Sequence, residues 1–155
     1  IDDPSFDKYT MSLVDRGYLY CIPHLRGTKF YGPQWYQDGK LLKKKNTFKD
    51  FQTTAEYLIK KKYTSPDKLV IEGGSAGGLL VGACLNMNPS LYNVAIMRVP
   101  YVDCLTTMLN PDILNILNGV ILQNIKLIMI IFSVILLMII SIVKKNTLIF
   151  TSIQD

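Results

Sequence analysis

The stretch KLVIEGGSAGGLLVGACLN, residues 68–86, constrains the fold more than any other part of the sequence. A short apolar run leads into a cluster of glycines around Ser75, and a longer run of small and apolar residues follows. The short run before the glycines predicts a buried strand, and the longer run after them predicts a helix. We therefore expect a strand over residues 68–72, a helix over residues 79–86 and a sharp turn between them.

Other apolar runs place this unit in a longer alternation of strands and helices. Apolar residues repeat at helical intervals over residues 48–59, and Thr47 with Asp50 has the spacing of a capping box at the start of that helix. Compact apolar runs over residues 18–23 and 94–100 predict strands. The resulting order of strands and helices predicts an α/β fold, with a mostly parallel sheet and helices on both faces.

Residues 73–77, GGSAG, fit the pattern Gly-x-Ser-x-Gly, which forms a nucleophile elbow when it lies between a strand and a helix. Gly73, Ala76 and Gly77 suit such a turn because strand and helix approach closely and leave little room for side chains. The turn puts Ser75 at the amino end of a helix, where the Ala76 N–H can donate to an oxyanion. The motif predicts a serine hydrolase with Ser75 as nucleophile. A phosphate-binding glycine turn, whose usual Lys-Ser is absent here, and a purely structural glycine turn are the alternatives.

Charge and cysteine content narrow the remaining classes of function. The formal net charge is +5, and the lysines cluster in GKLLKKKNTFKD and LIKKKYTSPDK without the interleaved aromatic residues that base stacking needs. We interpret these clusters as solvated helix faces and expect no nucleic-acid partner. The three cysteines have no CxxC spacing, so we expect no metal site, no disulfide framework and a reducing, cytoplasmic location.

Four long segments follow one another in the order MSLVDRGYLYCIPHLRG, QWYQDGKLLKKKNTFKDF, AEYLIKKKYTSPDKLVIEGGSAGGLLVGACLN and VPYVDCLTTML. Residues 1–113, which contain them, resemble the catalytic domain of the prolyl oligopeptidase family of serine peptidases (peptidase S9), above all its oligopeptidase B branch. The resemblance implies a partial α/β-hydrolase fold that hydrolyses short peptides without a cofactor or an obligate protein partner. It makes Ser75 the nucleophile, gives one oxyanion N–H to Ala76, and places Tyr101 near the pocket for the side chain before the cut bond.

The same resemblance implies that several catalytic groups are missing from this chain. In the family the triad runs in the order Ser, Asp, His, and its Asp and His lie beyond the point where the resemblance stops. The family's β-propeller and its second oxyanion donor, a tyrosine, would precede Ile1. His24, the only histidine, falls in a His-x-Arg-Gly stretch and is expected to be buried or to brace a loop, and Asp103 matches a different aspartate of the family. We therefore expect the chain as it stands to be nearly inactive.

The composition changes after residue 113. Residues 114–155 are dominated by Ile, Leu, Asn and Lys, and residues 127–143 carry no charge between flanking lysines. One interpretation is a transmembrane helix over residues 127–143, which would make the chain a single-pass, membrane-anchored and non-catalytic protein. The interpretation that we favour is translated intron or frameshifted sequence, because AT-rich codons supply these residues. A replacement core helix or strand is the third interpretation.

Overall fold

The structure is a computed structural model, and it describes residues 7–103 of the 155-residue chain. The expected boundary at residue 113, the apolar tail over residues 114–155 and its candidate spanning segment 127–143 lie outside the described residues. Of the helices within residues 7–103, none is both long enough and apolar enough to cross a membrane.

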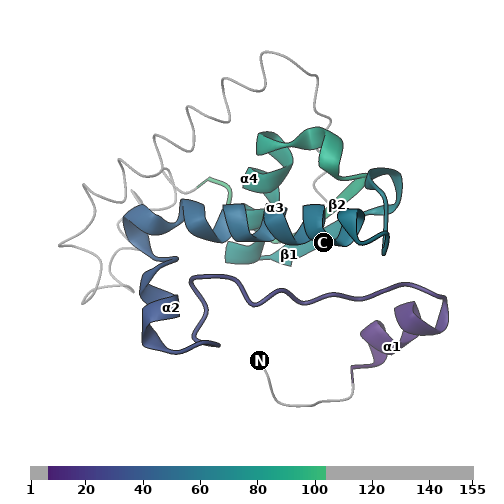
Figure 1. Cartoon of the computed structure of the whole chain (residues 1–155), viewed down its shortest axis with the longest axis horizontal. Coiled ribbons are helices and arrows are strands. Elements are labelled where there is room, and N and C mark those ends of the chain that lie inside the picture. Colours follow the sequence, from purple (N-terminus) through teal and green to yellow (C-terminus); the bar gives the residue numbers. More distant parts are fainter. Residues whose placement is uncertain (1–6, 104–155) are drawn as a thin grey trace.

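Two parallel strands form the sheet of the described region (Figure 1). Strand β1, Val70–Gly74, pairs with β2, Val94–Arg98, along the full length of both strands. Helix α4, Ala76–Met87, connects the two strands and packs against both of them. A parallel pair needs such a crossover connection, so the strand–helix–strand unit confirms the α/β class that the alternation predicted.

Helix α4 lies between the sheet and helix α3, Lys45–Lys60. Because α4 is covered on two sides, its residues are almost all small or apolar, and Val81 and Cys84 have no exposed surface at all. Phe48 of α3 and Ile71 of β1 pack into the same core. Burial raises the pKa of the Cys84 thiol to about 12, and its Sγ donates to the Phe48 carbonyl at 3.6 Å.

The two faces of the sheet differ in their cover. Side chains alternate between the faces of a strand, and Ile71 and Met97 lie on the face that packs against α4. On the opposite face Val70, Val94 and Ile96 are 43%, 44% and 41% exposed. The layer that α4 forms with α3 therefore covers one face of β1 and β2 and leaves apolar side chains on the other in contact with solvent.

The remaining helices are short. Asp7 caps the first of them by accepting the Tyr9 N–H at 3.0 Å, and Gly17, at φ 86°, turns the chain after it. Their bounds are α1 Lys8–Asp15 and α2 Pro33–Gln37, with 3₁₀ turns η1 Leu41–Lys43, η2 Pro66–Lys68 and η3 Pro89–Leu91.

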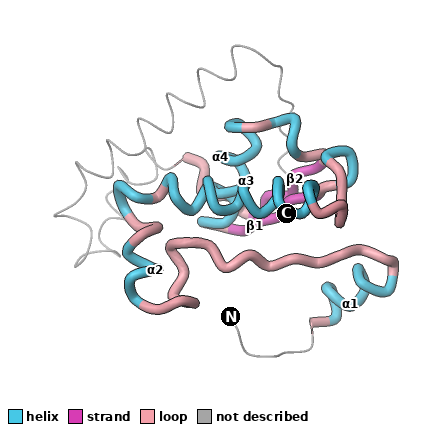
Figure 2. The backbone as a smooth tube through the Cα atoms, in the orientation of Figure 1, coloured by secondary structure: helices cyan, strands magenta, loops and turns pink. Residues whose placement is uncertain are grey.

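The expected strand over residues 18–23 is wrong. Between α1 and α2 the chain runs as a long loop that forms no ladder with β1 or β2 (Figure 2). Its side chains are exposed, with Leu19 at 65% and Ile22 at 60%, and Cys21 is exposed as well. A strand is stable only beside a neighbour, and among the described residues no strand pairs with this segment.

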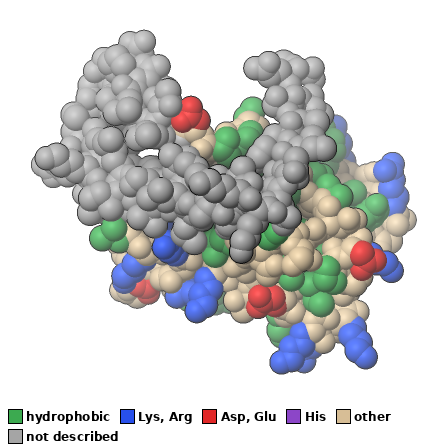
Figure 3. All heavy atoms as spheres, turned by 90° about the horizontal axis from the view of Figure 1, so that it is seen from above, with side chains coloured by type: hydrophobic (Ala, Val, Ile, Leu, Met, Phe, Trp, Pro, Cys, Tyr) green, Lys and Arg blue, Asp and Glu red, His purple; other side chains and the backbone are tan. Residues whose placement is uncertain are grey.

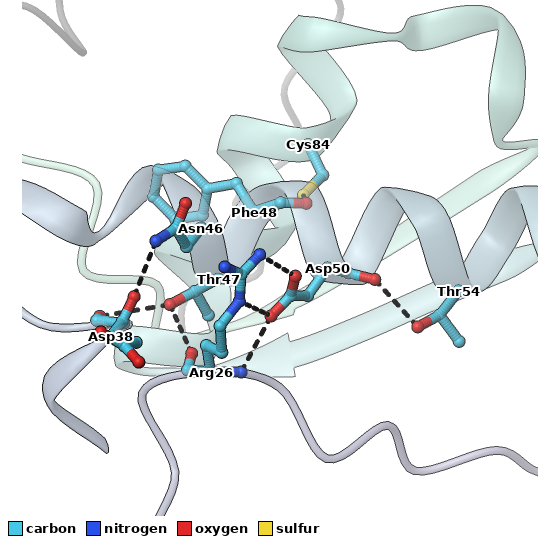
Figure 4. A network of polar contacts seen from close by, with 9 residues as sticks. Arg26, Asp38, Asn46, Thr47, Phe48, Asp50, Thr54 and Cys84 are labelled. Atoms are coloured by element: carbon cyan, nitrogen blue, oxygen red, sulfur yellow. Dashed lines mark hydrogen bonds and ion pairs between the residues drawn. The ribbon is translucent and has the colours of Figure 1, made fainter. Parts of the chain in front are cut away.

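Helix α3 confirms the expected helix over residues 48–59, but it begins at Lys45, so Thr47 and Asp50 do not form the expected capping box. The Thr47 hydroxyl donates to the Arg26 carbonyl at 2.7 Å. Asp50 accepts hydrogen bonds from the Arg26 backbone N–H at 3.0 Å and from its Nε at 2.8 Å (Figure 4). Both side chains therefore tie the loop before α2 to the first turns of α3.

Charged side chains are spread over the described part of one face of the molecule. On the face seen in Figure 3, Lys and Arg side chains stand around the margin with acidic side chains between them. Lys43 pairs with Asp38 at 2.7 Å, and the side chains of this pair are 57% and 31% exposed. Exposed pairs of this kind add little to stability, so we attribute the stability of the region to its core.

We expect the Asp50→Asn variant to lose about 2 kcal/mol of stability at pH 7, because Asp50 accepts charge-assisted hydrogen bonds from Arg26. The side-chain hydrogen bond from Arg26 lowers the pKa of Asp50 in the folded protein. The contribution is therefore complete above the unfolded pKa of about 3.9 and is lost as the pH falls through the lower folded pKa. Urea unfolding of both proteins at pH 7 and at several values below pH 4 measures this difference.

The control for this experiment is Asp38→Asn, which removes a partly exposed carboxylate that contacts Lys43 and Gln34. A clearly smaller loss at pH 7 is expected, because solvent screens this pair. Equal losses in the two variants would contradict a special role for the contact between Asp50 and Arg26.

Candidate active site

Ser75 occupies the single-residue connection between β1 and α4. Its backbone angles are φ 52° and ψ −117°, in a region that residues with a side chain seldom adopt. The serine is exposed, whereas the helix that follows it is largely buried. The residue of the predicted elbow therefore stands at a strained turn between a strand and a largely buried helix.

Hydrogen bonds on both sides of Ser75 fix this conformation. Its N–H donates to the Arg98 carbonyl at 3.0 Å. Its carbonyl accepts the N–H of Gly78 at 3.0 Å and of Leu79 at 3.3 Å, which are the first hydrogen bonds of α4, and also the N–H of Tyr101 at 3.0 Å. Ser75 is thus bonded both to its own helix and to the segment that leaves β2.

Ala76 is the first residue of α4 and is exposed. The first amides of a helix have no acceptor within it, and here the carbonyl of Ser75 is taken by the amides three and four residues on. The N–H groups of Ala76 and Gly77 therefore have no partner within α4. The arrangement can present a backbone donor beside the Ser75 hydroxyl, with the positive end of the helix dipole behind it.

The glycines of the turn differ in how closely they are packed. A Cβ at Gly73 would lie 2.3 Å from the carbonyl oxygen of Gly77, so strand and helix touch there and only glycine fits. A Cβ at Gly77 would meet nothing within 4 Å, so the steric reason expected for this position does not hold. The close contact lies one residue later, because a Cβ at Gly78 would come within 2.6 Å of Pro100 Cβ. Sequence reasoning missed Gly78, although the doubled glycine was a visible signal.

Tyr101 lies beside Ser75 in the structure. It is half-buried, and its N–H reaches the Ser75 carbonyl, so the two residues are joined through their backbones. The structure therefore brings together Gly73, Ser75, Ala76 and Tyr101, which the sequence placed at one site.

His24 lies on the loop before α2. Its ring stacks on Phe30, with centroids 3.5 Å apart and planes 7° from parallel. The histidine is exposed, which corrects the expectation of a buried residue but agrees with a role in bracing the loop. Asp103 is the last described residue. Within residues 7–103, no group of three or more His, Cys, Asp or Glu side chains could hold a metal ion.

An ion pair spans the sheet next to the turn. Arg98 Nη2 lies 2.7 Å from Glu72 Oε1, and the register places Arg98 beside Gly74, the residue before Ser75. The side chains are 70% and 35% exposed, so solvent weakens the pair. Its geometric effect is to join β1 and β2 at the end of the sheet where the serine turn lies.

A parallel strand, a one-residue serine turn, a helix and a second parallel strand define part of an α/β-hydrolase fold. This class matches the fold expected from the sequence. The chain belongs to the prolyl oligopeptidase family, a family of serine peptidases whose model matches residues 4–121.

Two relatives illustrate the match in sequence. The chain is 50% identical over 111 residues to dipeptidyl aminopeptidase BI of Pseudoxanthomonas mexicana. It is 48% identical over 111 residues to Protease 2 of Moraxella lacunata. Each match covers 72% of this chain, but only 15% of the first relative and 16% of the second. The chain therefore spans a small part of the length of these relatives.

Solved structures show the same relationship. Oligopeptidase B from Trypanosoma brucei, with covalently bound antipain in its closed form, is 53% identical and superposes with a TM-score of 0.56. Oligopeptidase B from Leishmania major is also 53% identical, with a TM-score of 0.55. These superpositions cover 59% and 58% of this chain and 13% of each solved chain.

We expect the Gly78→Ala variant to be destabilised by about 1–3 kcal/mol, because its Cβ has to displace the backbone or ring of Pro100. Gly77→Ala is the matched control, one residue earlier in the same helix turn with open space around its Cβ. Alanine favours a helix over glycine, so this control is expected to be more stable than the original chain by about 0.5–1 kcal/mol. Thermal or urea unfolding distinguishes the two, and a loss of equal size in both would contradict the contact with Pro100.

Proposed function

We propose that this chain carries the nucleophile region of a serine-type peptidase that hydrolyses short peptides. The observation that carries the proposal is the backbone of Ser75, which at φ 52° projects from the one-residue turn between β1 and α4. A serine in this position has its hydroxyl at the amino end of a helix, next to amides that have no partner within that helix. Membership of a serine peptidase family supports the same reading.

The chemistry would proceed by nucleophilic attack. Ser75 Oγ attacks the carbonyl carbon of the scissile peptide bond while a histidine removes the hydroxyl proton and a carboxylate orients that histidine. The Ala76 N–H donates to the oxyanion that forms, and one such donor contributes about 2.7–4 kcal/mol. Gly73 and Gly77 form the elbow, and Gly73 lets strand and helix approach closely enough to hold the serine. The histidine then returns the proton to the departing amine, and water releases the acyl group.

The substrate is proposed to lie across Ser75 and Tyr101. The hydrogen bond between the Tyr101 N–H and the Ser75 carbonyl supports this placement, because it holds Tyr101 beside the nucleophile. The relatives are named an aminopeptidase and a protease, and the solved relatives are oligopeptidases. Short peptides are therefore the proposed substrates, with no requirement for a cofactor or an obligate protein partner.

The histidine base and the orienting carboxylate are proposed to come from sequence outside residues 7–103. We assign residues 1–113 to the catalytic region and treat residues 114–155 as a separate segment of translated intron or frameshifted sequence. We also propose a cytoplasmic location, and the free thiols of Cys21 and Cys84 support it because a reducing environment preserves them. Sequencing of the transcript across Asn115 tests the division, since a spliced message that resumes family-like sequence is expected there and an uninterrupted message would reject it.

We expect a fluorophosphonate probe to label the 155-residue chain at Ser75, slowly, and the Ser75→Ala variant not at all. Loss of triad partners lowers rates on the order of 10⁴-fold or more, so incubation over hours at high probe concentration is needed. Intact-mass and peptide mass spectrometry locate the adduct.

Ser90→Ala is the matched control for this labelling. Ser90 is an exposed serine whose hydroxyl donates to Asn88 Oδ1 at 3.1 Å, and its removal is expected to leave the labelling unchanged. Labelling that persists at the same rate in Ser75→Ala would reject Ser75 as the activated residue.

A further inference from the structure

We propose that Val99 is a positioning residue for Ser75. Residues 98–101, which we call the strap, run from the end of β2 past the serine turn. The backbone of Val99 forms the bend that lets the strap bond to Ser75 on both sides. The inference rests on the proposed function in so far as Ser75 is the nucleophile, but the geometry of the strap can be tested without it.

The two ends of the strap bond to the same residue. The carbonyl of Arg98 accepts the Ser75 N–H at 3.0 Å, and the N–H of Tyr101 donates to the Ser75 carbonyl at 3.0 Å. A straight continuation of β2 would carry residue 101 away from the turn, because a strand advances about 3.3 Å per residue. The strap therefore has to bend back between these two bonds, and the bend falls at Val99.

Val99 adopts a conformation that its residue type and its neighbour both oppose. Its φ is 40°, in the left-handed region, where a β-branched residue is a genuine outlier. It also precedes Pro100, and the residue before a proline is driven toward extended backbone. The Val99 side chain is 86% exposed, so its own packing does not compensate for the strain. The conformation must be imposed by the contacts on either side of it.

Those contacts fix both flanks of Val99 to the elbow. On one side the Arg98 guanidinium pairs with Glu72 of β1 at 2.7 Å. On the other side Pro100 packs so closely on Gly78 of α4 that a Cβ at the glycine would lie 2.6 Å away. Strand, helix and serine therefore all hold the strap, and the strap in return holds Ser75.

The strap restrains the backbone conformation of Ser75. At φ 52° the serine is itself strained, and relaxation of its backbone would disturb its bonds to Arg98 and Tyr101. The strap thus opposes relaxation of the nucleophile and keeps Tyr101 beside it. Because the Val99 side chain points to solvent, this role depends on the φ angle that residue 99 can adopt and not on the size of its side chain.

The test is a series of variants at residue 99 in the full 155-residue chain: Val99→Gly, Val99→Ala and Val99→Pro. Glycine adopts positive φ without strain, so Val99→Gly is expected to raise the unfolding midpoint by about 4 °C or more. Val99→Ala is expected to lie between glycine and valine. Proline is locked near φ −65°, so Val99→Pro cannot form the bend.

The exchange rates of the Ser75 and Tyr101 amide hydrogens measure directly whether the hydrogen bonds between the strap and Ser75 are intact. Both amides are expected to stay protected in Val99→Gly and to exchange on the order of tenfold faster or more in Val99→Pro, since both lose their acceptor geometry. The amides of Val81 and Cys84 in the middle of α4 are the internal reference. If they stay protected in Val99→Pro, the effect is local and not a failure to fold.

Val102→Gly is the matched control for the glycine variant. Val102 is also exposed, at 51%, but it lies outside the strap and has no positive φ. Glycine there relieves no strain, adds chain entropy to the unfolded state and removes the side chain whose Cγ1 lies near Gly82, so the unfolding midpoint is expected to fall. A fall of equal size in Val99→Gly would overturn the inference, because it would mean that no strain is relieved at residue 99.

Phosphonylation of Ser75 separates positioning from stability. In Val99→Pro the rate at saturating fluorophosphonate is expected to fall on the order of tenfold, with the half-saturating concentration unchanged, whereas Val99→Gly keeps the rate of the original chain. Protected Ser75 and Tyr101 amides in Val99→Pro, or an unchanged rate there, would overturn the inference. If the original chain is never labelled, that result rejects only the proposed function. Hydrogen exchange in the residue-99 variants would still test whether the bend at Val99 holds Ser75.

Discussion

The close approach of β1 to α4 is the constraint on which the rest of the described structure depends. A Cβ at Gly73 would lie 2.3 Å from the Gly77 carbonyl oxygen and 2.9 Å from Val81 Cγ2, so strand and helix meet without a side chain between them. Their connection is one residue long, and Ser75 has to complete the change of direction by itself. Its φ of 52° follows from that geometry. A serine held this way stands on a helix in which Val81 and Cys84 are fully buried, and its position is therefore set by the core.

Local patterns in the sequence predicted the elements that local forces determine. The apolar spacing over residues 48–59 and the runs on either side of the glycines gave helices α3 and α4 and both strands to within three residues at each end. The strand expected over residues 18–23 failed because pairing depends on a neighbour, which composition does not reveal. Thr47 and Asp50 failed as a capping box for a related reason. Their partner, Arg26, lies more than 20 residues earlier in the chain, beyond what a spacing rule can detect.

The candidate site shows the same division between local and distant causes. The turn at Ser75 could be located from sequence because a serine with glycines before and after it, between an apolar strand and a small-residue helix, is the pattern of a nucleophile elbow. The strained conformation of Val99 could not be foreseen, since a valine before a proline at the end of a strand predicts extended backbone. The contact between Gly78 and Pro100 was hidden for a similar reason, as it joins α4 to a segment more than 20 residues further on. Backbone angles and interatomic distances were needed to find both.

One face of the sheet formed by β1 and β2 is not covered by α4. Val94 and Ile96 on that face are 44% and 41% exposed, so part of their apolar surface stays in contact with water. The matched region makes up 15% and 16% of the two relatives, so this chain spans only a small part of their length. The serine turn is held from within the described residues, because the glycine contact and the hydrogen bonds that bend it lie there. Its shape therefore does not depend on a cover over the exposed face.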